Sequence, residues 1–251
     1  MTAQTLPPYA ADWAFFLDLD GTLLEHAERP DAVRVDAPMR RLLGGLHEGA
    51  GGALALISGR AVTDIDRLCS PLVLPAAGQH GVERRDGAGR MHRHAFPEEP
   101  MRRAAARIAA YAARHPGLVF EDKGFNLALH YRLAPWQADA VRELIDGAAA
   151  ELGEGFEVQA GKMVLEIKPG GRDKGTAIGE FMAEAPFRGR TPVFIGDDLT
   201  DEFGFGVVNR LGGHAIKVGD GTSAACWRID DAAAVRRWLS AWVGRFGRRS
   251  A

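Results

Sequence analysis

The sequence predicts an α/β fold with a doubly wound parallel-sheet (Rossmann-like) core and an inserted α+β domain. Short apolar runs without polar alternation indicate strands that are covered on both faces. These runs alternate with stretches of helical period towards both ends of the chain, an order that builds a right-handed parallel sheet. The alternation breaks in the middle. We therefore expect a core of residues 1–82 and 170–251, and an insert of residues 83–169.

The first part of the core is expected to hold three strands and two helices in alternation. The strands correspond to AFFLDL, ALALISG and VLPAAGQHG, the last of which runs into a glycine-rich turn. The helices correspond to MRRLLGGLHEG and VTDIDRLC, in which apolar residues recur at helical spacing. This β–α–β–α–β order predicts parallel strands.

The insert has a different pattern. It begins with VERRDGAGRMHRH, which is typical of a hairpin with a turn at Asp86–Gly89. A long helix, EEPMRRAAARIAAYAARH, follows and ends at Pro116-Gly117. The alternating segments LVFED and FNLALHYR predict two strands, a helix extends from Pro135 to about Ala150, and FEVQ and MVLEIKP predict two more strands. These segments together indicate an α+β block.

The second part of the core resumes the α/β alternation. A helix in DKGTAIGEFMAEA leads to a strand in PVFIGDD, and a helix in TDEFGFGVV leads to a strand in HAIKVGD. A final helix is expected in AAVRRWLSAWVGRF. These segments would complete the same parallel sheet as the first part.

Bulk composition excludes several classes of protein. The net charge of −2 gives no reason to expect binding to nucleic acid or to an anionic membrane surface. No apolar run approaches the roughly 18 residues that span a bilayer, and no secretory signal is visible. Two cysteines do not make a disulfide framework. We expect a cytoplasmic protein, whose oligomeric state the sequence does not indicate.

Lysine is rare in this chain, and its positions are therefore informative. Of the 31 basic residues, 26 are arginine and 5 are lysine. A lysine kept in such a chain can be needed as a compact point charge, which arginine does not supply. The five are Lys123, Lys162, Lys168, Lys174 and Lys217.

Acidic residues follow two of the expected core strands. Asp18 and Asp20 end the first strand, and Asp197, Asp198 and Asp201 follow the strand VFIG. Ligands of open α/β sheets bind at the carboxyl ends of the strands, so these acids are expected to meet. Oxygen-rich clusters suit a hard cation, and beside phosphate that cation is usually Mg²⁺.

Such a cluster can carry out phosphoryl transfer. One carboxylate can attack phosphorus, while a second protonates the leaving oxygen and later deprotonates the water. The phosphoryl oxygens also need hydrogen-bond donors and positive charge. Ser58 and Gly59, after the strand ALALIS, and Lys174, at a helix start, supply them. Taken alone, each of these pieces also fits an ordinary turn or a solvated surface charge.

Four core segments resemble the motifs of the haloacid dehalogenase superfamily and, within it, those of the Mg²⁺-dependent phosphatases. They are DLDGT, ISGR, RDKG and GDDLTDE, in this order and spacing. The resemblance implies that Asp18 is the nucleophile and Asp20 the general acid and base. It also implies that Ser58 and Lys174 bind the transferring phosphoryl group.

The same resemblance implies a set of ligands for Mg²⁺. These ligands are Asp18, the backbone carbonyl of Asp20, and Asp197. Asp198 and Asp201 are expected beside or just behind them.

The insert carries a mixture of acids and bases that suits the hydroxyl groups of a sugar. His130 and Arg132 are two residues apart on one predicted strand, so they are expected on one face. The residues of interest are Glu121, Lys123, His130, Arg132, Lys162 and Glu166. Each of them also fits a solvated edge of an ordinary α/β sandwich.

The segments GQHG, EDKG…LHYR, GKMVLEIKP and GDDLTDE together resemble the trehalose-6-phosphate phosphatases, and the resemblance extends from about Phe15 to Trp242. It implies that the insert is a cap that closes over the core site. It further implies that Glu121, Lys123, Lys162 and Glu166 contact the disaccharide.

Some alternatives stay open at this point. Another sugar phosphate, such as a sucrose, glucosylglycerate or hexose phosphate, fits the core motifs equally well. A phosphotransferase shares the same covalent intermediate, and a binding module without turnover is the third alternative. Arg60, in the segment ISGR, is expected to bind the substrate, either at the phosphate or by bracing the cap.

Overall fold

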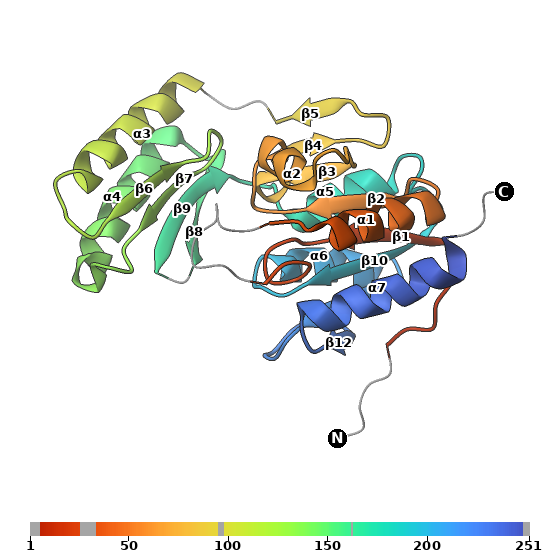
Figure 1. Ribbon diagram of the computed structural model, residues 1–251. Coiled ribbons are helices and arrows are strands. Elements are labelled where there is room, and N and C mark those ends of the chain that lie inside the picture. The colour runs from red at the N-terminus through yellow and green to blue at the C-terminus, as the bar shows by residue number, and fades with distance from the viewer. Residues whose placement is uncertain (1–5, 26–33, 95–97, 162, 248–251) are drawn as a thin grey trace. The chain divides into compact units, whose positions relative to one another are not determined.

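The computed structural model describes residues 6–25, 34–94, 98–161 and 163–247 (Figure 1). The chain divides into two compact units. The first combines Met1–Arg93 with Asp173–Ala251, and the second is His94–Arg172. None of the helices in the described parts of the chain has the length and apolar character that a membrane-spanning segment needs.

The first unit is built on an eight-stranded sheet in the order β12-β11-β10-β1-β2-β3-β4-β5. Neighbouring strands from β12 to β3 are parallel, whereas β4 and β5 are added antiparallel at one edge. The parallel part confirms the predicted doubly wound core. The strands are β1 (Trp13–Leu17), β2 (Leu54–Ile57), β3 (Ala76–Gly78), β4 (Glu83–Arg85), β5 (Met91–Arg93), β10 (Thr191–Gly196), β11 (His214–Val218) and β12 (Trp227–Ile229).

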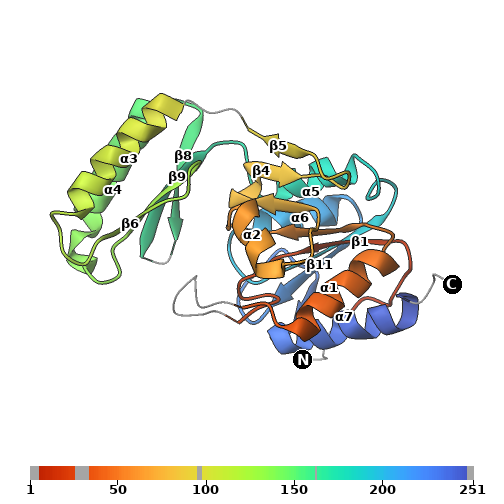
Figure 2. The same ribbon diagram turned by 45° about the horizontal axis from the view of Figure 1, so that its top comes forward.

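Helices cover both faces of this sheet (Figures 1 and 2). On one face, α1 packs on α7, and the ring of Phe15 meets Trp242 at 4.8 Å. Phe16 points to the other face, where α5 packs on α6, and its ring meets Phe181 at 5.9 Å and Phe187 at 5.4 Å. The helices are α1 (Ala37–Gly49), α2 (Val62–Cys69), α5 (Lys174–Met182), α6 (Asp201–Arg210), α7 (Ala232–Phe246) and the 3₁₀ turn η2 (Gln79–Gly81).

The second unit is an antiparallel sheet with two helices on one face, and its strand order is β6-β7-β9-β8. Apolar side chains of the strands and helices form its core, among them Ile108, Leu129, Val141, Ile145 and Ile167. The alternate residues of the strands therefore face away from the helices. The elements are α3 (Glu98–Ala112), β6 (Val119–Asp122), β7 (Leu127–His130), η3 (Pro135–Gln137), α4 (Ala138–Leu152), β8 (Phe156–Gly161) and β9 (Val164–Pro169).

The boundary between the two units differs from the expected one. The sequence placed the hairpin from residue 83 in the insert, but β4 pairs with β3 and extends the sheet of the first unit to Arg93. Side chains fix the hairpin there, because Glu83 accepts a 2.7 Å hydrogen bond from the N–H of Val62 and Arg85 donates to Asp66. At the other end the second unit reaches Arg172 instead of residue 169. Strand β12 was not predicted.

Candidate active site

A buried lysine joins two aspartates at the carboxyl end of the parallel sheet. Asp18 directly follows β1, and its Oδ1 accepts a hydrogen bond of 2.8 Å from Nζ of Lys174. The same Nζ donates to Oδ1 of Asp201 over 2.7 Å. The side chains of Asp18, Lys174 and Asp201 are 6%, 4% and 0% exposed, so the three charges interact with almost no water around them.

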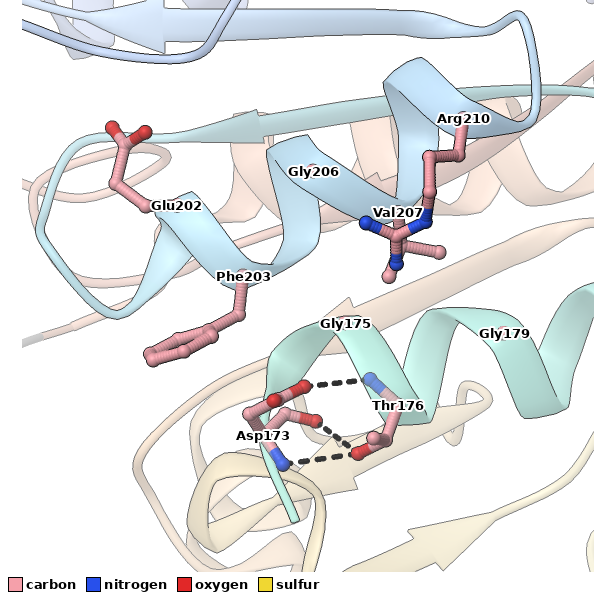
Figure 3. Close-up of a pocket in the computed structure, with 9 residues that line it drawn as sticks. All are labelled: Asp173, Gly175, Thr176, Gly179, Glu202, Phe203, Gly206, Val207 and Arg210. Carbon is pink, nitrogen blue, oxygen red and sulfur yellow. Dashed lines mark hydrogen bonds between the residues drawn. The ribbon is translucent and has the colours of Figure 1, made fainter. Parts of the chain in front are cut away.

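The start of α5 determines where Lys174 lies. Oδ1 of Asp173 accepts a 2.7 Å hydrogen bond from the N–H of Thr176, and Oγ1 of Thr176 accepts one of 3.0 Å from the N–H of Asp173 (Figure 3). This capping box begins the helix at Lys174. Gly175 lets α6 approach, because an added Cβ would lie 2.5 Å from the backbone oxygen of Phe203.

A groove of about 520 Å³ lies between α5 and α6, and Figure 3 shows the residues that line it. Its lining residues are Asp173, Gly175, Thr176, Gly179, Glu202, Phe203, Gly206, Val207 and Arg210. Of these nine described residues, none belongs to the set expected to bind metal, phosphate or sugar. The groove therefore reflects the glycines of two helices and does not mark the acidic cluster.

Asp201 also holds the loop that carries the next two acids. Its Oδ2 accepts hydrogen bonds of 3.0 Å from the N–H groups of Asp197 and Asp198. Gly196 leaves the room that this requires, since an added Cβ would lie 2.3 Å from Cγ of Asp201. Oδ1 of Asp197 accepts a hydrogen bond of 3.2 Å from Oγ1 of Thr22. The two strand ends β1 and β10 are thus linked through side chains.

Asp20 lies on a turn and pairs with Arg60. The turn continues through Gly21, whose φ of 89° is a conformation that suits glycine. Nε and Nη2 of Arg60 donate to Oδ2 and Oδ1 of Asp20 over 2.6 and 2.7 Å. This bidentate ion pair raises the pKa of Arg60 above its ordinary value, mainly through the hydrogen bond to Asp20. In this structure, then, Arg60 braces Asp20.

The turn after β2 carries Ser58, which is 1% exposed and whose Oγ accepts a 3.1 Å hydrogen bond from the N–H of Arg60. A second turn supports it from β3. There Gln79 and His80 have φ values of 48° and 58°, and their N–H groups donate to the carbonyls of Arg60 and Ser58. Non-glycine residues with such φ values are strained and persist only where their surroundings hold them. The ring of His80 packs on Gly59, where an added Cβ would lie 2.7 Å from Nε2.

Burial dominates the electrostatics of the cluster. It raises the pKa of Asp18 well above its ordinary value; Lys174 opposes this rise, and the charges of Asp201 and Asp197 add to it. Burial likewise raises the pKa of Asp201. Burial alone would lower the pKa of Lys174, but the carboxylates of Asp18 and Asp201 outweigh it, so the pKa is raised and the ammonium stays charged.

Three carboxylates form a group that can hold a metal ion. Ligand oxygens of Asp18, Asp197 and Asp201 all lie within 4.8 Å of one another. Asp198 lies outside this group, is exposed, and accepts a 2.8 Å hydrogen bond from Oγ1 of Thr200. The sequence grouped Asp198 with Asp201, whereas the structure brings only Asp201 among the carboxylates.

Several expected sugar-binding residues of the second unit meet on the sheet face that the helices leave open. Glu121 pairs in register with Ala128, which pairs with Glu166 on β9. Nζ of Lys123 donates to Oε1 of Glu166 over 3.3 Å and lies 3.9 Å from Oε2 of Glu121. Nε2 of His130 lies 3.1 Å from the same Oε2 of Glu121. Four of the expected residues therefore form one polar network.

Asn126 belongs to this network and was not singled out from the sequence. It is fully buried, and its Nδ2 donates to Oε1 of Glu166 over 3.1 Å. Its Oδ1 is buried without a partner among the described residues, so the amide orientation is set by Glu166 alone. A signal was available, because asparagine is disfavoured in strands and here directly precedes the apolar run Leu127–Leu129.

One expected residue in the described part of the second unit, Arg132, is not part of the network. β7 ends at His130, so the strand does not extend to Arg132, and the prediction that both lie on one strand face is wrong. Arg132 is exposed in the turn that follows. Lys162 lies outside the described residues.

The fold is that of sugar-phosphate and related phosphatases of known structure. The C-terminal domain of the trehalose-6-phosphate phosphatase of C. albicans matches with a TM-score of 0.81 at 23% identity, covering 94% of this chain and 93% of that one. A phosphatase of the haloalkanoate (HAD) enzyme superfamily from Bacteroides thetaiotaomicron matches with a TM-score of 0.61 at 15% identity, covering 96% and 99%. These likenesses define the fold class of this chain, which is the one that phosphatases of the HAD superfamily share.

Sequence comparison narrows the class. A family model described as trehalose-phosphatase matches residues 16–231. The trehalose-6-phosphate phosphatase of Escherichia coli (strain K12) is 46% identical over 93% of this chain and 87% of that protein. A probable trehalose-phosphate phosphatase of Sinorhizobium fredii is 44% identical over 92% and 87%. The chain belongs to the trehalose-phosphatase family.

Proposed function

We propose that this protein is a Mg²⁺-dependent phosphatase that hydrolyses trehalose 6-phosphate to trehalose and phosphate in the cytoplasm. One observation carries the chemistry: Lys174 is buried between Asp18 and Asp201, next to Asp197 and at the ends of parallel strands. Membership of the trehalose-phosphatase family supports the substrate. Both cysteines are free thiols, as a reducing compartment requires.

Asp18 is the proposed nucleophile. One of its carboxylate oxygens attacks phosphorus, the bond between phosphorus and the sugar oxygen breaks, and an aspartyl-phosphate forms. Lys174 keeps its charge here, so it orients Asp18 and offsets the charge of the phosphoryl oxygens. Ser58, buried at the end of the neighbouring strand β2, supplies a hydroxyl donor to the same oxygens.

Asp20 is the proposed acid and base. It gives a proton to the departing sugar oxygen, then takes one from the water that attacks the aspartyl-phosphate, which releases phosphate and restores Asp18. Arg60 holds both carboxylate oxygens of Asp20 through a bidentate ion pair.

The residues present fit a divalent metal ion. The donor set consists of carboxylate oxygens, which hard cations prefer, and the single charge of Lys174 does not offset all three carboxylates. Asp18, the backbone carbonyl of Asp20, and Asp197 would hold Mg²⁺. Both oxygens of Asp201 already accept hydrogen bonds, so its proposed role is to fix Lys174 and the loop. When bound, Mg²⁺ polarises the phosphoryl group and stabilises the developing charge.

The open face of the second unit is proposed to select the sugar. Glu121 on β6 and Glu166 on β9 offer acceptors in one row across β7, and Lys123, just after β6, offers donors. Sugar hydroxyls both donate and accept, so such a row can pair several of them at once. Lys162 remains a proposed contact on the strength of the family resemblance, and His130 and Arg132 remain proposed contacts because they belong to the mixture of acids and bases that suits a sugar.

The test is phosphate release from a panel of sugar phosphates, with Mg²⁺ and with EDTA, using Asp18→Asn as the control for the chemistry. We expect release from trehalose 6-phosphate above the sucrose, glucosylglycerate and hexose phosphates, no release with EDTA, and none from Asp18→Asn. Equal phosphate release from all the sugar phosphates would agree with the proposed core chemistry but contradict trehalose 6-phosphate as the preferred substrate. If added acceptor sugars lowered the amount of phosphate released, the protein would be a phosphotransferase. If no phosphate were released at all, it would be a binding module.

A further inference from the structure

Lys217 is a buried cation that the proposed chemistry does not use. It lies on β11, opposite Gly196 of β10 in the parallel register, so it is adjacent to the strand end that carries Asp197. The residue is 7% exposed. It is also one of only five lysines in a chain that uses arginine for most of its positive charge. Burying an ammonium group is costly unless its charge and donors are used, so its contacts need an explanation.

The ammonium group of Lys217 is held by backbone carbonyls. Nζ donates to the backbone oxygen of Asp197, and to that of Val218 over 2.9 Å. Across the described parts of the chain, no carboxylate forms an ion pair with Lys217. The charge therefore acts on the Asp197 peptide, and it does so through a charge-assisted hydrogen bond, which is about twice as strong as a neutral one.

Asp197 is consequently fixed from three directions. Its N–H donates to Oδ2 of Asp201, its carbonyl accepts from Lys217, and its Oδ1 accepts from Thr22. The peptide that Lys217 holds is the one whose N–H, on Asp198, also donates to Asp201. Orienting this peptide sets the direction in which the Asp197 side chain leaves the backbone.

We propose that Lys217 is a positioning residue, which aims the carboxylate of Asp197 at the metal through the Asp197 carbonyl. This inference rests on the proposed metal site but does not depend on which sugar phosphate is the substrate. Lysine suits the role because its ammonium is a compact charge that fits among carbonyls, whereas the guanidinium of arginine is wider and planar.

If Lys217 positions Asp197, its removal should weaken metal binding, whereas if only its positive charge matters, its removal should strengthen metal binding. Removing a positive charge near a cation site, taken alone, strengthens cation binding. Removing a group that orients a metal ligand weakens metal binding. Mutation of a residue that hydrogen-bonds to a metal ligand typically lowers metal affinity or activity by about 10- to 100-fold. The sign of the change in affinity therefore distinguishes the two.

The experiment compares the full-length protein with Lys217→Met. The matched control is Arg85→Met, which removes another buried cation of the same unit, one that donates to Asp66 and to the carbonyl of Leu74. Mn²⁺ alone is the probe, and its binding is followed by electron paramagnetic resonance of the free ion. Turnover of p-nitrophenyl phosphate at saturating Mg²⁺ is measured in parallel, with folding checked by circular dichroism.

We expect Lys217→Met to bind Mn²⁺ at least about tenfold more weakly than the parent protein. We also expect its kcat to be about tenfold lower, with KM changed less than about threefold. Arg85→Met should lose thermal stability but keep its Mn²⁺ affinity. Equal or tighter Mn²⁺ binding by Lys217→Met overturns the proposal. If Lys217→Met does not fold, Lys217→Gln, which keeps an N–H donor without the charge, takes its place, and undiminished Mn²⁺ affinity there overturns it equally. A parent protein that binds no Mn²⁺ contradicts the proposed metal site itself.

Discussion

At the scale of single residues, the acidic site depends on groups whose importance is steric as well as chemical. The side chain of Asp201 accepts three hydrogen bonds, one from Lys174 and two from the N–H groups of Asp197 and Asp198. It can do so only because Gly196 has no side chain. The motif residues are thus linked through one carboxylate that the reaction itself does not need to touch.

Gly196→Ala is expected to displace Asp201 and lower kcat for p-nitrophenyl phosphate by about 10- to 100-fold, the usual effect of disturbing a supporting residue. The added Cβ would lie 2.3 Å from Cγ of Asp201 and 2.6 Å from its Cβ and its Oδ2, so the carboxylate must move. Steady-state kinetics at saturating Mg²⁺ measure the effect.

The matched control for this change is Gly179→Ala in α5, where an added Cβ meets nothing within 4 Å. That substitution should leave kcat unchanged and stabilise the protein slightly, by about 0.5–1 kcal/mol, because alanine favours a helix over glycine. If Gly196→Ala retained full activity, the supporting role of Asp201 would be wrong.

At the scale of elements, the sheet edge of the first unit shows what the sequence could not reveal. The hairpin itself was predicted, together with its turn at Asp86–Gly89. Its partner was not, because an alternating pair of strands carries no information about the sheet it joins. That choice depends on contacts distant in sequence, such as those of Arg84 with Glu180 on α5 and with Glu184 just after that helix.

The turn of this hairpin is held by Asp86. Its Oδ1 accepts hydrogen bonds of 2.9 Å from the N–H groups of Ala88 and Arg90, and its Oδ2 accepts from the side chains of Arg90 and His92. Burial raises the pKa of Asp86, but these hydrogen bonds outweigh it, so the pKa lies well below the ordinary 3.8. The charged carboxylate is therefore the form that stabilises the fold.

Asp86→Ala is expected to lower the free energy of unfolding at pH 7 by about 2–3 kcal/mol, as for lost hydrogen bonds to a charged group. A depressed pKa gives stability that is present above the unfolded-state value and is lost as the pH falls through the folded-state value. The difference between parent and variant should therefore shrink below about pH 4. Urea denaturation between pH 7 and pH 3 measures it, with the exposed Asp220→Ala as control, and a pH-independent difference would contradict the assignment.

At the scale of the whole molecule, the sequence predicted the core well and the second unit less completely. Asp18, Asp20, Ser58, Lys174 and Asp197 follow strands or begin helices, so periodicity and topology together bring them to one edge. The network of the second unit depends on strand register instead. The strand register places Glu121 and Glu166 in one row across the sheet, with β7 between them. The spacing of residues along the chain does not predict this register.

The lengths of the strands were the other limit of prediction. The continued alternation in LHYR suggested that β7 would reach Arg132, but the strand ends at His130, where Tyr131 turns to donate to the carbonyl of Met163. Asn126 directly precedes an apolar run, where asparagine is unusual, but this signal does not say which group it contacts. Its contact with the buried Glu166 depends on how the strands pair.

In the proposed reaction the first unit carries out the chemistry and the second unit selects the sugar, and these separate roles can be tested. Glu166→Ala should lower kcat/KM for trehalose 6-phosphate by about tenfold or more, since it removes the acceptor that Lys123 and Asn126 hold in place. It should change kcat/KM for p-nitrophenyl phosphate less than about twofold, because that substrate has no sugar to contact. Glu143→Ala, an exposed glutamate on α4, controls for the stability of the same unit. Equal losses on both substrates, with folding intact by circular dichroism, would mean that Glu166 supports the catalytic unit and does not recognise the sugar.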